Sequence, residues 1–244
     1  MKDILQDIVA HTHSLGTLNM VKVTPSEDST LIESITDDRT IILIANTHQK
    51  VDQFVEVFGM PDLNKLQYHL KNPEYAENAK ITVETNVRNG IELPTHIHFE
   101  NEKSDFQNDY RFMEKKIIEE KLKSVKFKVS EWEISFQPSV TSIQRLKLMS
   151  GNLGPDEKLF QVKTEDDNLN FYFGDLNTHA GKFTFQHNVE GSLKYSWFWN
   201  VDSVKGILDL DGEKTMSISD QGAMMISVDS GLAKYDYILP AHQK

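Results

Sequence analysis

The stretch GAMMISVDSGLAKYDYILPA, residues 222–241, is the part of the sequence that best indicates the fold. Within it, Tyr235, Tyr237 and Leu239 recur at every second position. Successive side chains of a strand point to opposite faces, so this spacing predicts a β-strand. A preceding run of apolar residues and the glycine at Gly231 predict that the whole stretch forms a β-hairpin.

Similar strand patterns occupy most of the chain outside this hairpin. Residues at alternate positions are apolar in 169–173 and 193–199, and IILIAN at 41–46 is a short continuous apolar run. The pairs Asn89-Gly90 and Asp211-Gly212 lie between such runs, where turns are expected. The sequence therefore predicts a sheet-rich protein.

Four segments depart from the strand pattern and show helical spacing of apolar residues. They are Asp3 to Ser14, Pro61 to Leu70, Val140 to Met149, and Val201 to Leu210. The first two segments begin about 58 residues apart and the last two about 61, which predicts one structural unit written twice. Asp62 and Asp202 lie at helix starts, where a carboxylate can accept hydrogen bonds from first-turn amides.

A lysine-rich run, FMEKKIIEEKLKSVKFKV at 112–129, separates the two halves. We predict an N-terminal domain at 1–112, a connector at 113–129 and a C-terminal domain at 130–244. Apolar residues alternate at 125–129 as in an extended segment, and their phase slips near Ser130. The earlier part, Glu114 to Leu122, is equally consistent with a short exposed helix.

Length and composition limit the class of protein. A chain of 244 residues is long enough for two domains of ordinary size. It has no cysteine, which excludes disulfide scaffolds, thiolate metal sites and cysteine nucleophiles. The N-terminal region carries Asp3 and Asp7 where a signal peptide would be apolar, and no apolar run is long enough to span a membrane, so we expect a cytoplasmic protein without membrane contact.

Catalytic and cofactor motifs are missing from the sequence. It contains no P-loop, no dinucleotide-binding glycine motif and no G-x-S-x-G elbow, and its acidic runs do not fit a calcium-binding loop. Two H-x-H pairs, His11 with His13 and His96 with His98, would each place both rings on one face of a strand. No ligand cluster with suitable spacing accompanies them, so we expect no metal, no cofactor and no catalytic residues.

The cations of the four helical segments are the main candidates for a binding surface. With Lys2 and Lys71 at their flanks, these segments hold six basic and five acidic residues, whereas the whole chain has a net charge of −11. The six basic residues are Lys2, Lys65, Lys71, Arg145, Lys147 and Lys205. The helices are thus less acidic than the remainder of the chain.

In its order of elements, the chain resembles the DNA polymerase sliding clamps, especially the trimeric clamps of tailed phages related to proliferating cell nuclear antigen. The resemblance is most specific in the last hairpin and in FGMPDLNKLQYHL at 58–70. In the hairpin it lies in Gly231, Leu232, Lys234, Tyr235, Tyr237 and Leu239.

The resemblance implies an α+β DNA-clamp fold of two similar domains, each with two helices packed on antiparallel sheets. Three chains would close a homotrimeric ring around duplex DNA, and the six helix cations would face the DNA. Subunit contacts would lie near Gln107 to Phe112 and near Lys182 to His187, with Phe112, Phe183 and Phe185 in the interface. The implied function is that of a non-enzymatic processivity factor for the replicative DNA polymerase.

A clamp of this family also captures peptides of other proteins and is opened by a separate loader ATPase. The resemblance implies a peptide pocket beside the connector, formed by Val125, Phe127, Tyr237, Ile238, Leu239 and Pro240. The plain alternative for these residues is a β-sheet core.

Two other functions fit the residues. One is a metal-dependent enzyme of β-rich fold that uses His96 and His98. The other is a β-sandwich binding module with Trp197 and Trp199 as an exposed platform, although alternation favours a core position for both rings beside Leu193 and Tyr195.

Overall fold

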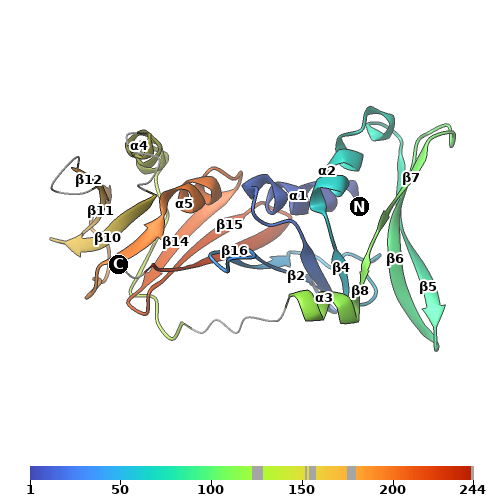
Figure 1. Ribbon diagram of the computed structural model, residues 1–244, viewed down its shortest axis with the longest axis horizontal. Coiled ribbons are helices and arrows are strands. Elements are labelled where there is room, and N and C mark those ends of the chain that lie inside the picture. The colour runs from blue at the N-terminus through green and yellow to red at the C-terminus, as the bar shows by residue number, and fades with distance from the viewer. Residues whose placement is uncertain (123–128, 152, 154–157, 175–179, 243–244) are drawn as a thin grey trace. The chain divides into compact units, whose positions relative to one another are not determined.

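The computed structural model describes residues 1–122, 129–151, 153, 158–174 and 180–242, which form two compact units (Figure 1). Unit 1 comprises Met1–Val125 and Ser230–Tyr235, and unit 2 comprises Lys126–Asp229 and Asp236–Lys244. The chain thus returns to unit 1 for a few residues near its C-terminus. The functional domain boundaries expected from the sequence remain a prediction.

Unit 1 contains two antiparallel sheets. The first has the order β8-β4-β1-β2-β3, formed by Met113–Glu114, Phe58–Met60, Val21–Pro25, Thr30–Ile35 and Ile42–Thr47. The second has the order β5-β6-β7, formed by Lys80–Arg88, Ile91–Glu100 and Gln107–Arg111. Asn89 and Gly90 both have positive φ, 53° and 80°, which suits the tight turn between β5 and β6.

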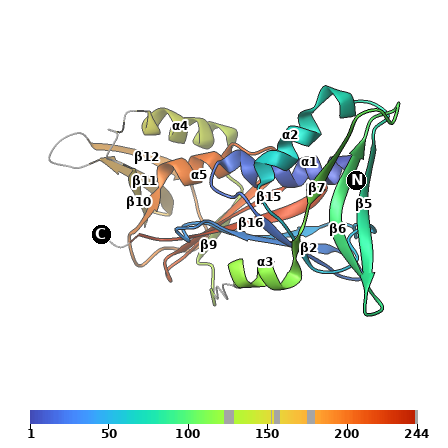
Figure 2. The same cartoon turned by 45° about the vertical axis from the view of Figure 1, so that its right-hand side comes forward.

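Helices α1 (Lys2–Ala10) and α2 (Leu63–Lys71) pack against each other in unit 1 (Figure 2). Their apolar stripes are fully buried at Leu5, Ile8 and Leu66. Asp62 precedes α2 as expected, but its backbone is left-handed and its side chain caps no amide. The carboxylate instead pairs with Lys65 at 3.1 Å, so the expected capping role of Asp62 was wrong.

A polar network fixes α1 to the segment that returns to unit 1. Asp7 accepts hydrogen bonds from Ser230 Oγ at 2.9 Å and Tyr235 Oη at 2.7 Å, and it pairs with His11 at 3.2 Å. The His11 ring stacks on Tyr235 with centroids 4.4 Å apart. Burial by itself would raise the pKa of Asp7, but the His11, Tyr235 and Ser230 contacts lower it below its ordinary value.

Unit 2 also combines two groups of antiparallel strands. One sheet has the order β12-β11-β10-β13, formed by Ala180–Gln186, Asn168–Gly174, Leu159–Glu165 and Trp197–Asn200. The neighbouring strands β15 (Ala223–Asp229), β14 (Glu213–Ser219) and β9 (Ile134–Phe136) pair in that order. Phenylalanine rings fill the first sheet's inner face, where Phe171 and Phe185 stack at 4.3 Å. The last strand, β16 (Ala233–Pro240), is divided between the two units.

Helices α4 (Val140–Ser150) and α5 (Val201–Leu208) pack together in unit 2. Ser139 and Asn200 cap their first turns by accepting backbone hydrogen bonds. Asp202 therefore lies inside the first turn and is not the cap, contrary to expectation. The predicted apolar face of α4 is also only partly buried, because Leu146 is enclosed whereas Val140 is 72% exposed.

The segment between the halves contains β8 and the short helix α3 (Lys115–Lys121). Of the two alternatives for Glu114 to Leu122, an extended segment and a short exposed helix, the structure shows the helix. It buries Ile118 and leaves its other side chains exposed. No strand is assigned to the described residues 129–133, and β9 begins at Ile134.

One predicted strand begins later than its pattern suggested. Lys194 and Tyr195 donate their backbone N–H groups to the Asp220 carboxylate, so this stretch bonds to a side chain and not to a sheet. Strand β13 starts only at Trp197, and Tyr195 is 61% exposed. The predicted α+β class is confirmed: α1 and α2 lie in unit 1, α4 and α5 lie in unit 2, and the short helix α3 adds a third helix to unit 1. No helix in the described part is long and apolar enough to cross a membrane.

Candidate nucleic-acid interface

Three of the six candidate cations lie on the helix pair of unit 1. Lys2 Nζ donates to the Tyr75 and Ala76 carbonyl oxygens at 2.6 and 2.9 Å, so it satisfies the end of the short helix η2 (Pro73–Tyr75). Lys65 is exposed and pairs with Asp62. Lys71 is exposed in the last turn of α2.

The other three lie on the helix pair of unit 2. Arg145 and Lys147 are exposed on α4, and Lys147 forms an ion pair with Asp209. Lys205 on α5 pairs with Asp202 at 3.2 Å. The structure therefore places all six cations on or beside the four helices, as the sequence predicted, but it gives most of them an internal partner.

Within the described ranges, Lys71 and Arg145 are the candidates with no polar partner. The lysines paired with Asp62, Asp202 and Asp209 are exposed enough for water and salt to screen their ion pairs. Such exposed pairs contribute roughly 0–1 kcal/mol, so an ammonium group can exchange its carboxylate for a phosphate at little cost. The helices can thus make several weak phosphate contacts and few strong ones.

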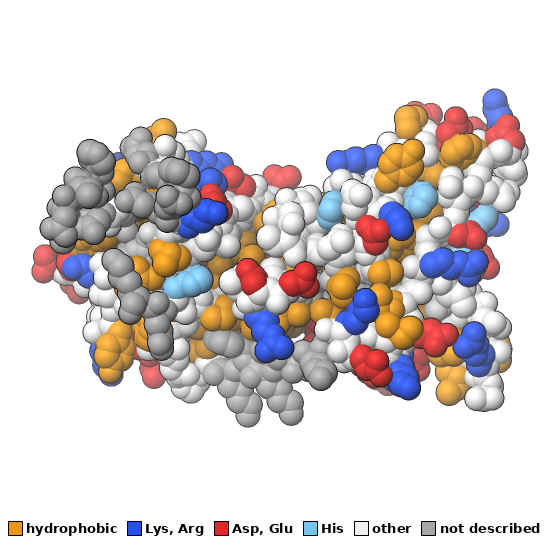
Figure 3. Space-filling view, in the orientation of Figure 1, with side chains coloured by type: hydrophobic (Ala, Val, Ile, Leu, Met, Phe, Trp, Pro, Cys, Tyr) orange, Lys and Arg blue, Asp and Glu red, His pale blue; other side chains and the backbone are white. Residues whose placement is uncertain are grey.

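The surface charge agrees with this weak character. On the described residues of the face drawn in Figure 3, acidic and basic side chains are intermixed and do not separate into one large basic patch. Tight nonspecific DNA-binding proteins neutralise many phosphates at once with clustered Lys and Arg. The helix surfaces of this chain do not have that arrangement.

The peptide pocket expected from the resemblance is only partly described. Val125 and Phe127 lie outside the described residues. Tyr237 and Leu239 are buried in unit 2, where Trp199 Nε1 donates to the Leu239 carbonyl at 3.0 Å, and Ile238 is 7% exposed. These three side chains therefore form core, as the plain alternative held, and of the C-terminal candidates only Pro240 is partly open to a ligand.

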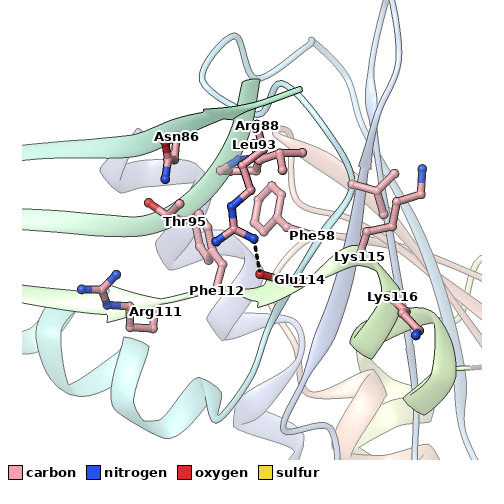
Figure 4. A pocket seen from close by; sticks show the side chains of 12 residues that line it. Phe58, Asn86, Arg88, Leu93, Thr95, Arg111, Phe112, Glu114, Lys115 and Lys116 are labelled. Carbon is pink, nitrogen blue, oxygen red and sulfur yellow. Dashed lines mark hydrogen bonds and ion pairs between the residues drawn. The ribbon is translucent and has the colours of Figure 1, made fainter. Parts of the chain in front are cut away.

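A hollow that the sequence did not indicate lies at the start of α3 (Figure 4). Its volume is about 330 Å³, and Phe58 and Phe112 contribute aromatic walls. Four basic residues line it together with one glutamate, which pairs with Arg88 at 3.1 Å. The basic residues are Arg88, Arg111, Lys115 and Lys116, and the glutamate is Glu114. An acidic peptide group would find several charge partners here.

Both segments predicted to lie at subunit contacts are edge strands. In unit 1, β7 is at one end of the β5-β6-β7 sheet, and in unit 2, β12 is at one end of its four-stranded sheet. The candidate Phe112 is half-buried and packs 4.2 Å from Phe58. Phe183 is half-buried, whereas Phe185 is 1% exposed and belongs to the core. In the isolated chain, Phe185 therefore cannot offer its ring to another subunit.

One row of backbone groups on β7 faces away from β6, and none of the other described strands pairs with it. Phe112 N donates to the Thr95 carbonyl and Asn101 N donates to the Phe106 carbonyl, so the even-numbered residues of β7 face β6. The N–H and C=O groups of Gln107, Asp109 and Arg111 point the other way. A row of this kind is a template for pairing with another strand.

The β12 edge carries a compact charged cluster. Glu165 on β10 accepts hydrogen bonds from Lys182 at 2.6 Å and from Tyr172, and it pairs with Lys163 at 2.7 Å. These contacts, led by the one with Lys163, lower the pKa of Glu165 to about 2. Lys182 is thereby fixed on the edge strand itself.

The tryptophans do not support the alternative function of a β-sandwich binding module. Trp199 is 1% exposed and Trp197 is half-buried against Gly222, so they form no exposed platform for a sugar. The histidine pair is different, because Asp109 joins it. His96, His98 and Asp109 offer ligand atoms that all lie within 4.8 Å of one another. The hydrogen bond between His98 and Asp109 raises the pKa of His98 and lowers that of Asp109.

Comparison with known proteins finds similarity in structure only. No protein-family model matches the chain, and no curated protein matches its sequence. The fold matches proliferating cell nuclear antigen (PCNA) from Entamoeba histolytica with a TM-score of 0.64 and 9% identity, covering 99% of this chain and 94% of the other.

Two further structures match with a TM-score of 0.67. A. fulgidus PCNA, solved with the C-terminal region of FEN-1, is 11% identical over 100% of this chain and 95% of its own. PCNA from Thermococcus kodakaraensis is 9% identical over 99% of this chain and 97% of its own. The predicted DNA-clamp fold is therefore confirmed: from end to end, this chain has the fold of PCNA.

Proposed function

We propose that this chain is a DNA sliding clamp, a non-enzymatic processivity factor that encircles duplex DNA as a ring of three copies. The observation that carries the proposal is the coverage of the fold match, which includes 99–100% of this chain and 94–97% of each PCNA chain. A partial match would be compatible with a shared domain used for another purpose. A match of both halves in sequence order supports the same overall use.

The positions of β7 and β12 at the ends of their sheets support closure of the ring. A head-to-tail contact between two different surfaces of one chain gives a closed ring when its rotation is threefold. Pairing of β7 with β12 of the next copy would cover these two edge strands in every subunit, so that neither is exposed for aggregation. Phe112 and Phe183 would lie at this contact, with Phe185 supporting it from the core.

The weak positive charge of the helices supports sliding. A ring held by topology does not need tight phosphate contacts, and tight contacts would slow its movement along the duplex. Lys71 and Arg145 would contact phosphates directly, while Lys2, Lys65, Lys147 and Lys205 would do so by exchanging their present partners. None of these contacts reads base sequence.

The replicative DNA polymerase and a loader ATPase are the proposed protein partners. The A. fulgidus PCNA structure contains a C-terminal peptide region of FEN-1, which supports peptide capture as the mode of partner binding. On this chain, Pro240 and the hollow lined by Arg88 and Arg111 are the described candidates for such contacts.

Binding to two forms of one DNA tests the proposal without a loader or a polymerase. A closed ring can thread onto the free ends of a linear duplex, but it cannot enter a covalently closed circle. The full chain is mixed with linear plasmid DNA whose ends are then blocked by bulky proteins, so that a threaded ring cannot slide off. We expect it to co-elute with this DNA and not with the closed circle of identical sequence. Equal retention on both forms would refute encirclement.

A further inference from the structure

The two histidines and Asp109 lie on the face of the β5-β6-β7 sheet that points away from the buried residues. His96 and His98 are two positions apart on β6, while the intervening Ile97 is fully buried on the other face. On β7, Asp109 lies directly opposite His98 in a pair without backbone hydrogen bonds, the geometry in which side chains approach most closely. Asp109 Oδ1 is 2.9 Å from His98 Nδ1 and 3.5 Å from His96 Nε2.

Thr95 determines which nitrogen of His96 carries the hydrogen. Its Oγ1 donates its single hydrogen to the Glu84 carbonyl at 2.9 Å. His96 Nδ1 also lies 2.9 Å from this hydroxyl oxygen, which must therefore accept a hydrogen bond from Nδ1. In the neutral ring, Nδ1 then carries the hydrogen and Nε2 presents a lone pair to Asp109 Oδ1. Two acceptors that face each other in this way are complementary to a cation between them.

His98 has the corresponding support on its other nitrogen. Its Nε2 lies 3.5 Å from Glu100 Oε2, while Nδ1 faces Asp109. Metal-binding histidines usually donate their second ring N–H to a carboxylate or another acceptor, which orients the ring. Thr95 serves His96 in this role and Glu100 serves His98.

The surroundings leave the third ligand atom accessible. Arg111 Nη2 approaches Asp109 on the Oδ2 side, at 4.0 Å, and leaves Oδ1 toward the histidines. The side chains of His96, His98 and Asp109 are 18%, 21% and 39% exposed, so an ion can reach them from solvent. The cluster opens into a hollow that Lys80, Glu84 and Gln107 also line.

We propose that His96 Nε2, His98 Nδ1 and Asp109 Oδ1 bind one divalent transition-metal ion of the zinc class, with water at the fourth position. Two imidazoles and a carboxylate suit Zn²⁺, and bonds of about 2.0–2.2 Å at tetrahedral angles separate ligand atoms by about 3.4 Å. Asp109 Oδ1 already lies 3.5 and 2.9 Å from the two nitrogens, and the ligand atoms of the cluster all lie within 4.8 Å of one another, so side-chain rotations would complete the site. On binding, the proton between His98 Nδ1 and Asp109 leaves to solvent.

The proposal concerns metal binding alone and assigns no reaction to the site. The site joins β6 to the edge strand β7 and lies within unit 1, so it does not depend on the proposed ring function. It also revises the expectation from sequence that the chain has no metal site. The sequence showed the two histidines but could not pair them with Asp109.

Zinc titration of the full chain tests the proposal. The protein is stripped with a chelator, exchanged into metal-free buffer, and titrated with ZnCl₂ in competition with a chromophoric chelator. We expect one ion per chain. Asp109→Asn should weaken binding by at least about 100-fold. Thr95→Val, which removes the hydroxyl that faces His96 Nδ1 and donates to the Glu84 carbonyl, should weaken it by roughly 10–100-fold. His187→Gln, which removes an exposed histidine of unit 2, should have no effect.

Two readouts keep the test independent of folding. Circular dichroism establishes that each variant is folded, and Co²⁺ in place of Zn²⁺ should give the visible absorption of a tetrahedral site in the wild type and not in Asp109→Asn. The proposal would be overturned if the wild type bound no zinc at a ratio of one per chain. It would also be overturned if folded Asp109→Asn and His187→Gln variants both bound zinc as the wild type does.

Discussion

Substitution of Arg111 by proline tests the proposed pairing of edge strands. The Arg111 N–H points away from β6, so it is one of the groups that would donate to β12 of the next copy. Proline removes this donor and is tolerated on edge strands where the N–H does not serve the strand's own sheet. The substitution should therefore leave the β5-β6-β7 sheet intact.

The expected effect follows from the carbonyl group on the partner strand. A carbonyl oxygen that is buried at the subunit contact without its donor costs about 1–3 kcal/mol. That corresponds to a weakening of roughly 5- to 150-fold in the dissociation constant of each contact. A closed threefold ring repeats the contact three times, so every subunit boundary is weakened equally.

Sedimentation velocity over a range of protein concentrations measures the effect. The wild type should sediment with three times the chain mass of 28.0 kDa at micromolar concentration, whereas Arg111→Pro should dissociate. Arg111→Ala is the matched control, because it removes the side chain and keeps the N–H, and it should behave as the wild type. An unchanged mass for Arg111→Pro, or equal dissociation of Arg111→Ala, would refute the backbone pairing.

Three further variants test other features of the molecule. Asp7→Asn should lower the free energy of unfolding by about 1–3 kcal/mol at neutral pH, measured by urea denaturation. The pKa of Asp7 is lower in the folded than in the unfolded chain, so its contribution to stability is complete above the unfolded pKa of about 4. This contribution disappears as the pH falls through the folded pKa. The difference in stability between the wild type and Asp7→Asn should therefore shrink in acid. The double variant Lys71→Glu/Arg145→Glu should bind linear duplex with a shallower slope of log K against log salt concentration, reduced by about 1 for each phosphate that the helices no longer neutralise. The control Lys194→Glu should leave this slope unchanged. Leu146→Ala, at a fully buried position of α4, should cost about 2–5 kcal/mol of stability without preventing folding at low temperature.

The helices were predictable because their apolar spacing is local. The 3.6-residue pattern located α1, α2, α4 and α5 within a few residues, since α1, α2 and α5 each bury one stripe of side chains and α4 buries Leu146. The local pattern could not predict that Val140 is exposed, because its exposure depends on which residues pack beside the start of α4. The prediction of a strand over 193–196 was also wrong for a nonlocal reason, because the Asp220 carboxylate accepts the backbone hydrogen bonds of this segment.

The candidate site was less predictable than the fold. Charge counting identified the helix cations, but it could not show that Lys2 is held by carbonyl oxygens or that Lys147 pairs with Asp209. These partners come from other elements of the same unit. The metal cluster has the same difficulty, because Asp109 reaches His98 only through the register of β6 and β7.

The most direct test of encirclement uses one set of components in two orders of addition. A linear duplex with biotin at both ends is incubated with the full chain before or after streptavidin blocks the ends, and is then washed at high salt to remove adhering protein. Threading predicts that protein is retained only when it is added before the blocks. Equal retention in both orders, or no retention in either, would contradict the claim that the chain forms a closed ring around DNA.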